Sequence, residues 1–459
     1  MMSFVFSGEN LAGTLRRAPG TSLTEFTYDP EYIANGGFPL APELPFRKQP
    51  ISSSGLHPFF CNLISEGLRE KIQQQAISST GVRPNITRYD LLVFFGADCF
   101  GAISVIPEFQ IEPDKAVALE SLSKDPIFKL YAHIPGYQPK YLAVKNGKGG
   151  FRGTARGEVS THIAKLSMPE KEKIFGIIEN EYVTNRLMAV LLPSDRVVDA
   201  EIADFGDEGV NALIVKRFDR AERSEGLQRL RFLEFNQLLG RQSEDRYKGH
   251  YGEMAQYIRE HSQNKQDRIA TNIEDVKKLY LRILASFVLG VTDNHFKNYG
   301  LIEQDGEMRL SPNYDLVSSV LIKKPGTQGT DFSTLALNIG MEHGRNTESN
   351  MKLGQLRPKH IIALGRDFGL TNDEILEACY QIRKGIDNIE SFPEFGDKTL
   401  DRLREVLINH ANRRWRASFA GVSSIMNFRA AKNDITGPTS GAAHPISTGR
   451  FSDHPPPAR

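Results

Sequence analysis

The hydrophobic pattern of the chain changes its period near residue 230, and this change constrains the fold more than any other feature. Between residues 129 and 225 apolar residues alternate as in strands, around one amphipathic helix predicted over 173–192. Beyond residue 230 apolar residues recur at helical spacing, which predicts helices over 271–290, 357–368, 372–384 and 398–418. The sequence therefore predicts a mixed α+β protein, with a strand-rich part followed by a mainly helical part.

The first 110 residues combine strand and helix signals. A hairpin is predicted to turn near Gly8 to Asn10, and strand character continues over 22–33 ("SLTEFTYDPEYI"). Helical spacing follows over 57–77, and the polar connection 109–128 is the predicted domain boundary. The chain then divides into an N-terminal subdomain (1–110), a strand-rich unit (129–225), a helical unit (226–424) and a Pro-, Gly- and Ser-rich tail predicted to be disordered (425–459).

Composition narrows the class of protein. The 459 residues are 40% hydrophobic and 25% charged, which is typical of a soluble globular protein with a sizeable core. A formal charge of +1 gives no overall attraction to nucleic acid. The three cysteines lie far apart, which argues against a zinc site and a disulfide framework and favours a reducing cytoplasm. No apolar run is long enough to span a membrane, and the N-terminus does not have the pattern of a signal peptide.

The stretch "GVTDNHFKNYG" (290–300) carries the strongest chemical signal. It follows a predicted buried helix that opens with Thr271 and Glu274 at the spacing of a capping box. Asp293 and Asn298 stand five residues apart, and phosphoryl transfer needs a carboxylate near the attacking hydroxyl and an amide that can hold magnesium. Taken alone, the stretch favours a hydrogen-bonded polar turn over a catalytic loop.

A second carboxylate follows in the next segment. Residues 299–315 are predicted to form two strands around an Asp305-Gly306 turn, and this hairpin can return Asp315 beside Asn298. Two literal Asp-Phe-Gly triplets are not expected to bind metal. The first, at Asp204, precedes a turn between strands, and the second, at Asp367, ends a predicted helix.

The strand-rich unit offers candidates for binding a nucleotide. The loop "HIPGYQPK" (133–140) could present backbone amides to phosphate, although it could also be an ordinary surface turn. Lys165 shares one face of a predicted strand (158–166) with Thr161 and Ile163 and could neutralise phosphate. Glu181 could orient that lysine or lie at the surface. The segment "VKRFD" (215–219) ends a strand where a kinase hinge would lie, so its backbone could contact the edge of the adenine.

Taken together, these motifs resemble the HipA family of bacterial serine/threonine kinases. The similarity rests on "FFCNLISEGLR", "YDLLVFFGADCFGAISVIPE", "IPGYQPK", "THIAKL", "ENEY", "KRFDR", "GVTDNHFKNYGL" and "LSPNYDLVS", all in the family's order. The resemblance implies a two-lobed, protein-kinase-like fold with an added N-terminal subdomain. The unit 129–225 would be the nucleotide-binding lobe, and 226–424 would be the helical lobe that carries the catalytic loop.

The resemblance also implies roles for individual residues. Asp293 matches the catalytic proton acceptor, Asn298 and Asp315 match the Mg²⁺ ligands, and Lys165 matches the phosphate-binding lysine. The residues expected to contact ATP are Pro135, Gly136, Tyr137, Gln138, Pro139, Lys140, Lys165, Lys216, Arg217, Phe218, His295, Phe296, Lys297, Asn298, Tyr314 and Asp315.

As a family member, the chain would phosphorylate a protein serine, with aminoacyl-tRNA synthetases as targets known in the family, and so arrest growth. Its partner would be a helix-turn-helix antitoxin of the HipB type, through which it would meet operator DNA. Two alternatives stay open. The chain could be a catalytically weak co-repressor that tightens an antitoxin on its operator, or a kinase whose acceptor is a lipid or small molecule.

The sequence departs from the family at one regulatory position. In many members a serine at the start of the glycine loop becomes phosphorylated and switches the kinase off, whereas His133 stands here. We therefore predict that this form of shut-off is absent, so that control rests on the antitoxin or on another loop hydroxyl such as Thr154. Intact-mass analysis after incubation with ATP checks this, since a stable phosphate mapped to 130–140 would contradict it.

Overall fold

The computed structural model describes most of the chain. The described residues are 2–64, 68–79, 86–108, 140–147, 149–155, 158–167, 176–206, 209–224, 226–262, 271–304, 306–322, 333–340 and 349–426. The predicted boundary 109–128, the first seven residues of the loop 133–140 and nearly all of the tail 425–459 lie outside these ranges. None of the described helices is long and apolar enough to cross a membrane.

The N-terminal part is an antiparallel sheet with short helices packed against it. Its strand order is β4-β3-β2-β1-β5, with bounds β1 (Met2–Ser7), β2 (Asn10–Arg17), β3 (Leu23–Tyr28), β4 (Ile51–Ser54) and β5 (Ile103–Pro107). The helices are α1 (Pro30–Ala34), α2 (Pro58–Cys61), α3 (Leu68–Ser79), α4 (Arg88–Phe95) and the 3-10 turn η1 (Gly96–Asp98). Burial alternates along β1, with Ser3, Val5 and Ser7 on the buried face and Met2, Phe4 and Phe6 partly buried on the other.

The next part is a small closed barrel of five strands. Its order is β10-β8-β6-β7-β9, with bounds β6 (Lys140–Lys145), β7 (Phe151–Gly153), β8 (His162–Leu166), β9 (Ala200–Phe205) and β10 (Val210–Lys216). Small side chains, such as Ala143, Ala164 and Ala212, fill much of its interior. The helix α7 (Ile177–Leu191) crosses between β8 and β9 and packs Ile177 and Ile178 against β10.

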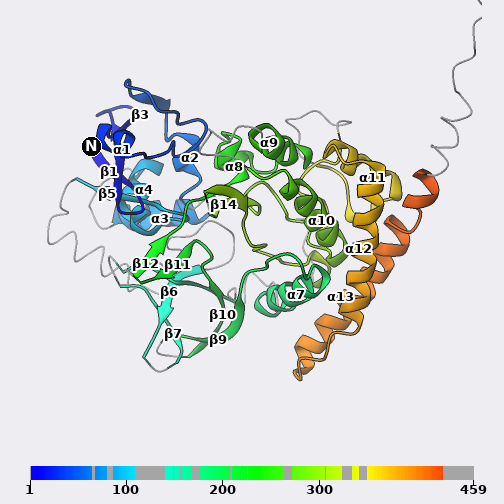
Figure 1. Cartoon of the computed structure of the whole chain (residues 1–459). Coiled ribbons are helices and arrows are strands. Elements are labelled where there is room, and N and C mark those ends of the chain that lie inside the picture. Colours follow the sequence, from blue (N-terminus) through cyan, green and yellow to red (C-terminus); the bar gives the residue numbers. More distant parts are fainter. Residues whose placement is uncertain are drawn as a thin grey trace, which may run out of the picture.

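The remainder is mainly helical, as the change of period predicts. Figure 1 shows its long helices on the side of the molecule away from the N-terminal sheet. They are α8 (Phe235–Leu238), α9 (Gly252–Ser262), α10 (Glu274–Leu289), α11 (Pro358–Asp367), α12 (Asn372–Glu390) and α13 (Lys398–Ser418), with the turns η3 (Ser243–Asp245), η4 (Ser319–Leu321) and η5 (Leu353–Gln355). The strands are β11 (Arg220–Arg223), β12 (Gly226–Arg229), β13 (Phe232–Glu234), β14 (Gly300–Gln304) and β15 (Glu307–Leu310). The predicted mixed α+β class is thus confirmed.

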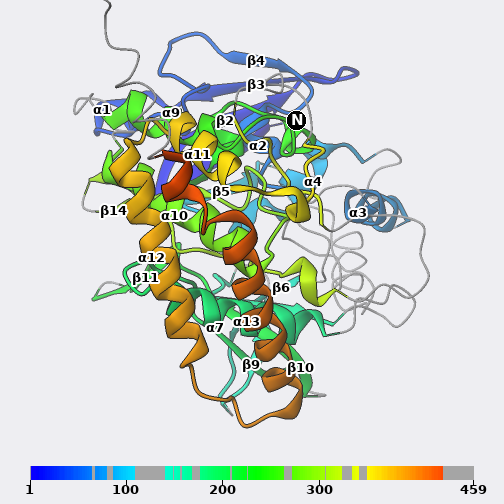
Figure 2. The same cartoon turned by 90° about the vertical axis from the view of Figure 1, so that its right-hand side faces the viewer.

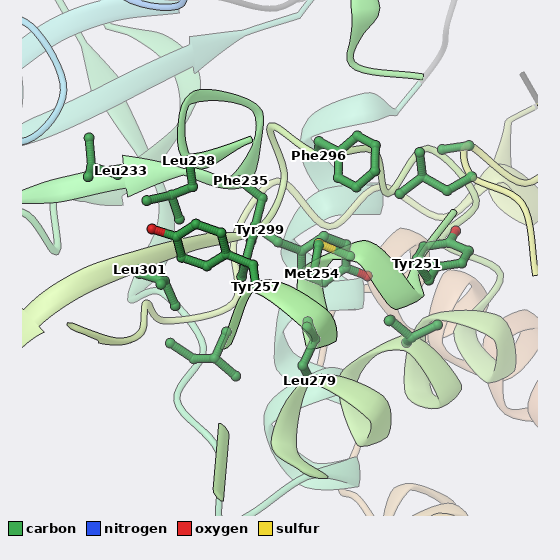
Figure 3. Packing of buried hydrophobic residues seen from close by; sticks show 14 of the residues in the cluster. Leu233, Phe235, Leu238, Tyr251, Met254, Tyr257, Leu279, Phe296, Tyr299 and Leu301 are labelled. Atoms are coloured by element: carbon green, nitrogen blue, oxygen red, sulfur yellow. The ribbon is translucent and has the colours of Figure 1, made fainter. Parts of the chain in front are cut away.

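Helix α7 joins the barrel to the helical part. It packs on α12 and α13, which lie side by side in Figure 2. One continuous hydrophobic core runs from the N-terminal sheet through α7 into the helices. Figure 3 shows the part of this core in which Phe296 and Tyr299, from the 290–300 stretch, lie among residues of α8, α9 and α10. The polar stretch is therefore fixed to the core by its own aromatic residues.

A buried cluster of charges ties the N-terminal part to the barrel. Asp98 accepts hydrogen bonds from the backbone N–H and hydroxyl of Ser160 (2.9 and 2.7 Å) and from Arg220 (2.6 Å). Arg217 forms a two-point pair with Asp219 (2.6 and 2.9 Å) and donates to Ser160 Oγ (2.7 Å). Because both arginines are buried and matched by carboxylates, breaking the cluster would leave unpaired charge in the interior.

We expect replacement of Asp98 by asparagine to lower the free energy of unfolding by about 2 kcal/mol at neutral pH. Burial alone would raise the pKa of Asp98, but Arg217 and Arg220 outweigh it and lower this pKa from 3.8 to about 2. The ionised carboxylate therefore stabilises the fold above about pH 4, and this contribution is lost as the pH falls toward 2.

Urea titrations of both proteins from pH 7 down to pH 3 measure this effect, and the difference between them should narrow with falling pH. The matched control is Asp199→Asn, which alters an exposed side chain and should behave like the unmodified chain. A difference that stays constant with pH would contradict the assignment.

Several predicted elements need correction. Strand character does not continue through 22–33, because Pro30 begins α1 and Asp29 caps it. The segment 57–77 forms two helices rather than one. The strand predicted from residue 158 begins at His162, and the helix predicted over 372–384 continues to Glu390.

The predicted capping box of α10 is wrong. The Thr271 hydroxyl donates to the carbonyl of Ile258, and Asn272 Oδ1 accepts from the backbone N–H of Glu274 at 3.0 Å instead. The Asn272 side chain thus bonds the first residue of α10, whose N-cap residue Ile273 makes no side-chain cap.

Candidate active site

The loop that carries Asp293 begins where α10 ends. Gly290 adopts a positive φ of 73°, a conformation that favours glycine, and its N–H caps the helix on the carbonyl of Ser286. The loop backbone then closes on itself. The N–H of His295 donates to the Asp293 carbonyl (3.2 Å), and the N–H of Asn298 donates to the His295 carbonyl (2.9 Å).

Asn298 is held by its side chain as well. Its Nδ2 group donates to the carbonyl oxygen of Asp293 at 3.0 Å, so Oδ1 is the atom that could ligate a cation. This hydrogen bond links Asp293 and Asn298, the two polar residues that the sequence analysis singled out. Neither the backbone contacts nor the Asn298 amide touches the carboxylate of Asp293.

The Asp293 carboxylate is accessible to solvent but crowded by surrounding protein. This partial loss of hydration raises its pKa to about 6, a hydrogen bond from Tyr247 opposes the rise, and the negative charge of Asp315 adds to it. Tyr247 Oη lies 3.0 Å from Asp293 Oδ1. Sequence reasoning missed Tyr247, because nothing in its local pattern points to the loop 46 positions further along the chain.

Four charged side chains meet where the barrel faces the helical part. Lys165 Nζ lies 2.5 Å from Glu181 Oε1 and 2.6 Å from Asp315 Oδ1. Lys140 is the cross-strand partner of Lys165, and its Nζ lies 3.5 Å from the same oxygen of Asp315. Two lysines directly opposite one another repel, so the carboxylate between them is what makes this pairing tolerable.

The pKa values in this group follow from its geometry. Burial would lower the pKa of Lys165, but Asp315 and Glu181 outweigh burial and raise it above its ordinary value. Burial would raise the pKa of Asp315, but Lys140 and Lys165 hold it well below the ordinary range. Burial raises the pKa of Glu181, and the adjacent ammonium of Lys165 opposes this. Glu181 is fully buried, so the surface alternative for this residue is excluded.

Asp315 reaches this group from an unusual backbone conformation. Its φ is +57°, and within the described residues it is the one non-glycine residue with a positive φ. Such conformations cost energy and concentrate at functional sites. The neighbouring Tyr314 donates from its hydroxyl to the carbonyl of Lys297 (2.7 Å), which brings the Asp315 segment against the loop next to Asn298.

Helix α7 also holds the residues that follow Asp315. The side chain of Asn180 donates to the carbonyl of Ser318 and accepts from its N–H, both at 2.9 Å. Since Glu181 is the next residue on α7, this one helix positions both Lys165 and the Asp315 segment. Asn180 lies within the motif "ENEY", but no role was predicted for it.

The side chains of several remaining predicted contact residues have partners of their own. The Lys297 ammonium is buried and donates to Ser243 Oγ (3.1 Å), and the Arg217 guanidinium belongs to the cluster around Asp98. Phe296 is buried in the core. Lys216 is exposed at the end of β10, and Phe218 packs against Tyr314. The residues Pro135, Gly136, Tyr137, Gln138, Pro139 and His133 lie outside the described ranges.

Neither of the Asp-Phe-Gly triplets joins the site. Phe205, the last residue of β9, packs inside the barrel, and Asp204 before it is exposed. Asp367 ends α11 and accepts from His250 Nδ1 at 2.9 Å, in keeping with a structural role.

Family profiles and related proteins match most of the chain. The profile of the HipA-like C-terminal domain matches residues 132–389, and that of the HipA N-terminal domain matches 4–106. A Sinorhizobium fredii protein named "Putative kinase Y4dM" is 31% identical over 317 residues, covering 66% of this chain and 70% of the relative. "Putative kinase Y4mE" from the same organism is 29% identical over 303 residues, covering 61% and 69%.

A solved structure shows the same fold. It is HipA of Shewanella oneidensis MR-1, determined together with HipB and its operator DNA. The match has a TM-score of 0.67 at 20% sequence identity and covers 93% of this chain and 99% of that one.

Proposed function

The chain belongs to the HipA family, and from this premise we propose that it is a two-lobed protein kinase that transfers the γ-phosphate of Mg·ATP to a serine or threonine of another protein. The observation that carries the proposal is the junction of Lys165, Glu181 and Asp315. A lysine on a barrel strand, paired with a glutamate on the following helix, is the arrangement by which kinases hold the phosphates of ATP.

The lysines would bind and orient the nucleotide. Lys140 and Lys165 present two ammonium groups at one point of the barrel, where they now share the carboxylate of Asp315. When Asp315 binds a metal cation instead, the negatively charged phosphates of ATP would replace it as the partner of these two ammonium groups. Glu181 would stay with Lys165, because a buried carboxylate needs an adjacent cation to offset the cost of its burial.

Asp315 and Asn298 Oδ1 would hold Mg²⁺. A carboxylate and an amide oxygen are the hard oxygen donors that this ion prefers, and the contact of Tyr314 with Lys297 keeps their two segments together. The bound ion would offset the charge that the transferring phosphate develops. The residues present therefore fit the ion that the family implies.

Asp293 would receive the acceptor hydroxyl. Its carboxylate faces solvent, within one loop of Asn298, so an incoming serine could donate its hydroxyl proton there as it attacks the γ-phosphate. The reaction leaves a phosphoserine and ADP, with the proton on Asp293.

The biological role follows the family. We propose that the chain is the toxin of a toxin–antitoxin pair and arrests growth by phosphorylating a cellular protein such as an aminoacyl-tRNA synthetase. The relative from Shewanella oneidensis is seen with HipB and operator DNA. A helix-turn-helix antitoxin is accordingly the proposed partner, and the chain would reach operator DNA through it.

Acceptor analysis tests the proposal. The full-length chain is incubated with cell extract and labelled ATP, and label is measured separately in protein and in the small-molecule and lipid fractions. Label on serine or threonine of a discrete protein supports the proposal. Label confined to lipid or small molecules would replace it with the alternative acceptor class, and no label with ATP still bound would favour the co-repressor.

A further inference from the structure

The loop around Asp293 fixes its own backbone but not its carboxylate. The contacts from His295 and Asn298 both end on the carbonyl oxygen of Asp293, so the side chain could still rotate. Within the described residues, the Tyr247 hydroxyl is what holds it, by donating to Oδ1 at 3.0 Å. One oxygen of the carboxylate is thus committed to Tyr247, which directs the other to a defined place.

Tyr247 is itself held firmly against the loop. Its ring meets the ring of His295 edge to face, with centroids 4.9 Å apart, and the guanidinium of Arg246 lies 4.8 Å from its centre on another side. The N–H of Phe296 donates to the carbonyl of Arg246 at 3.3 Å. The buried ammonium of Lys297 donates a hydrogen bond to Oγ of Ser243, four residues before Tyr247. Three consecutive loop residues, His295, Phe296 and Lys297, therefore contact the segment 243–247.

The tyrosine is suited to act as a donor. Burial and the charge of Asp293 raise the pKa of Tyr247 well above its ordinary value, so the hydroxyl keeps its proton at any physiological pH. A neutral phenol beside a carboxylate donates a charge-assisted hydrogen bond, which is stronger than one between neutral groups. Such a bond restricts an otherwise mobile general base to one orientation, and this is how supporting residues make a site productive.

We propose that Tyr247 is a positioning residue for phosphoryl transfer, which holds Asp293 Oδ1 so that Oδ2 receives the proton of the acceptor hydroxyl. This inference rests on the proposed kinase function and adds to it a residue outside every motif that the sequence displayed. The segment 243–247, which is distant in sequence from the catalytic loop, would therefore orient the catalytic carboxylate.

The test is Tyr247→Phe in the full-length chain, which removes one oxygen atom and keeps the ring contacts. We expect the turnover number for phosphate transfer to extract protein to fall by about 10- to 100-fold, the effect of losing one hydrogen bond to a charged group. The KM for ATP should stay as it is, because the Tyr247 hydroxyl contacts Asp293 and not the lysines. The melting temperature should stay as it is, because phenylalanine keeps the packing of the ring against the hydrophobic core. The matched control is Tyr380→Phe, since Tyr380 is 64% exposed on α12.

The outcomes separate this inference from the function on which it rests. Activity in the unmodified chain that is lost in Asp293→Ala but unchanged in Tyr247→Phe would overturn the role of Tyr247 alone. A parallel rise in KM or fall in melting temperature would show a merely structural role and overturn it as well. No transfer by the unmodified chain would overturn both.

Discussion

Replacement of Asp315 by alanine is expected to lower phosphate transfer by on the order of 10³-fold. The reason is that Asp315 has two tasks. It is a proposed ligand of Mg²⁺, and in its absence the charges of Lys140 and Lys165 are no longer balanced at the point where they meet. Magnesium-dependent binding of an ATP analogue, followed by calorimetry, should weaken together with turnover.

The sequence supplies a matched control for this change. Asp204→Ala alters the first residue of a literal Asp-Phe-Gly triplet whose side chain is exposed on β9, away from both lysines. That variant should keep full activity. If Asp204→Ala lost activity and Asp315→Ala retained it, the metal ligand would be misassigned and the ordinary kinase triplet would be the better guide.

Replacement of Lys165 by methionine should lower the free energy of unfolding by about 3–5 kcal/mol and abolish transfer. Glu181 has no exposed surface, so it would be left charged without its partner, or forced to take up a proton. Urea titration measures the stability, and the same preparation is assayed for transfer. Lys145→Met, on an exposed position of β6, is the control and should change stability by less than about 0.5 kcal/mol.

The double variant Lys165→Met/Glu181→Leu distinguishes the two consequences. It removes both charges and fills the space with apolar atoms, so most of the lost stability should return. Transfer should not return, because the phosphates would still lack their lysine. Recovery of activity in the double variant would show that the pair serves only the fold.

The alternation of apolar residues was sufficient to predict where Lys165 lies. It placed this lysine on a strand before an amphipathic helix, and that helix begins at Ile177 and carries Glu181. Such patterns succeed because burial on one face of a strand or helix is a local property of the sequence. The two strands after the 290–300 stretch were predicted from the Asp305-Gly306 turn between them. They pair antiparallel as expected, but the second strand ends at Leu310 and not at Asp315.

Side-chain direction was harder to predict. Lys297 stands in the motif beside Asn298, yet its ammonium turns inward to Ser243, 54 positions earlier in the chain. Arg217 turns to a cluster that includes Asp98 from the N-terminal part. Both cations are buried and therefore need acceptors. The acceptor of Lys297 is distant in sequence, whereas Arg217 combines the distant Asp98 with Asp219, two residues further along the chain.

The site residues that were not predicted also have partners distant in sequence. Tyr247 and Asn180 act on the site through partners 46 and 138 positions away, so no local spacing marks them. The error at Thr271 has a local cause, because the neighbouring Asn272 accepts the hydrogen bond from the N–H of Glu274 at the start of α10. Local rules thus find the elements and the charged residues, and the folded structure is needed to find what holds them in place.

The most direct test of the central claim is transfer of labelled γ-phosphate from Mg·ATP into extract protein by the unmodified chain and by Asp293→Ala, with ATP binding measured for both. We predict a discrete labelled protein with the unmodified chain and none with the variant, although both bind ATP. Equal labelling by the two would show that Asp293 is not the proton acceptor, and no labelling by the unmodified chain would contradict the assignment of this site to a protein kinase.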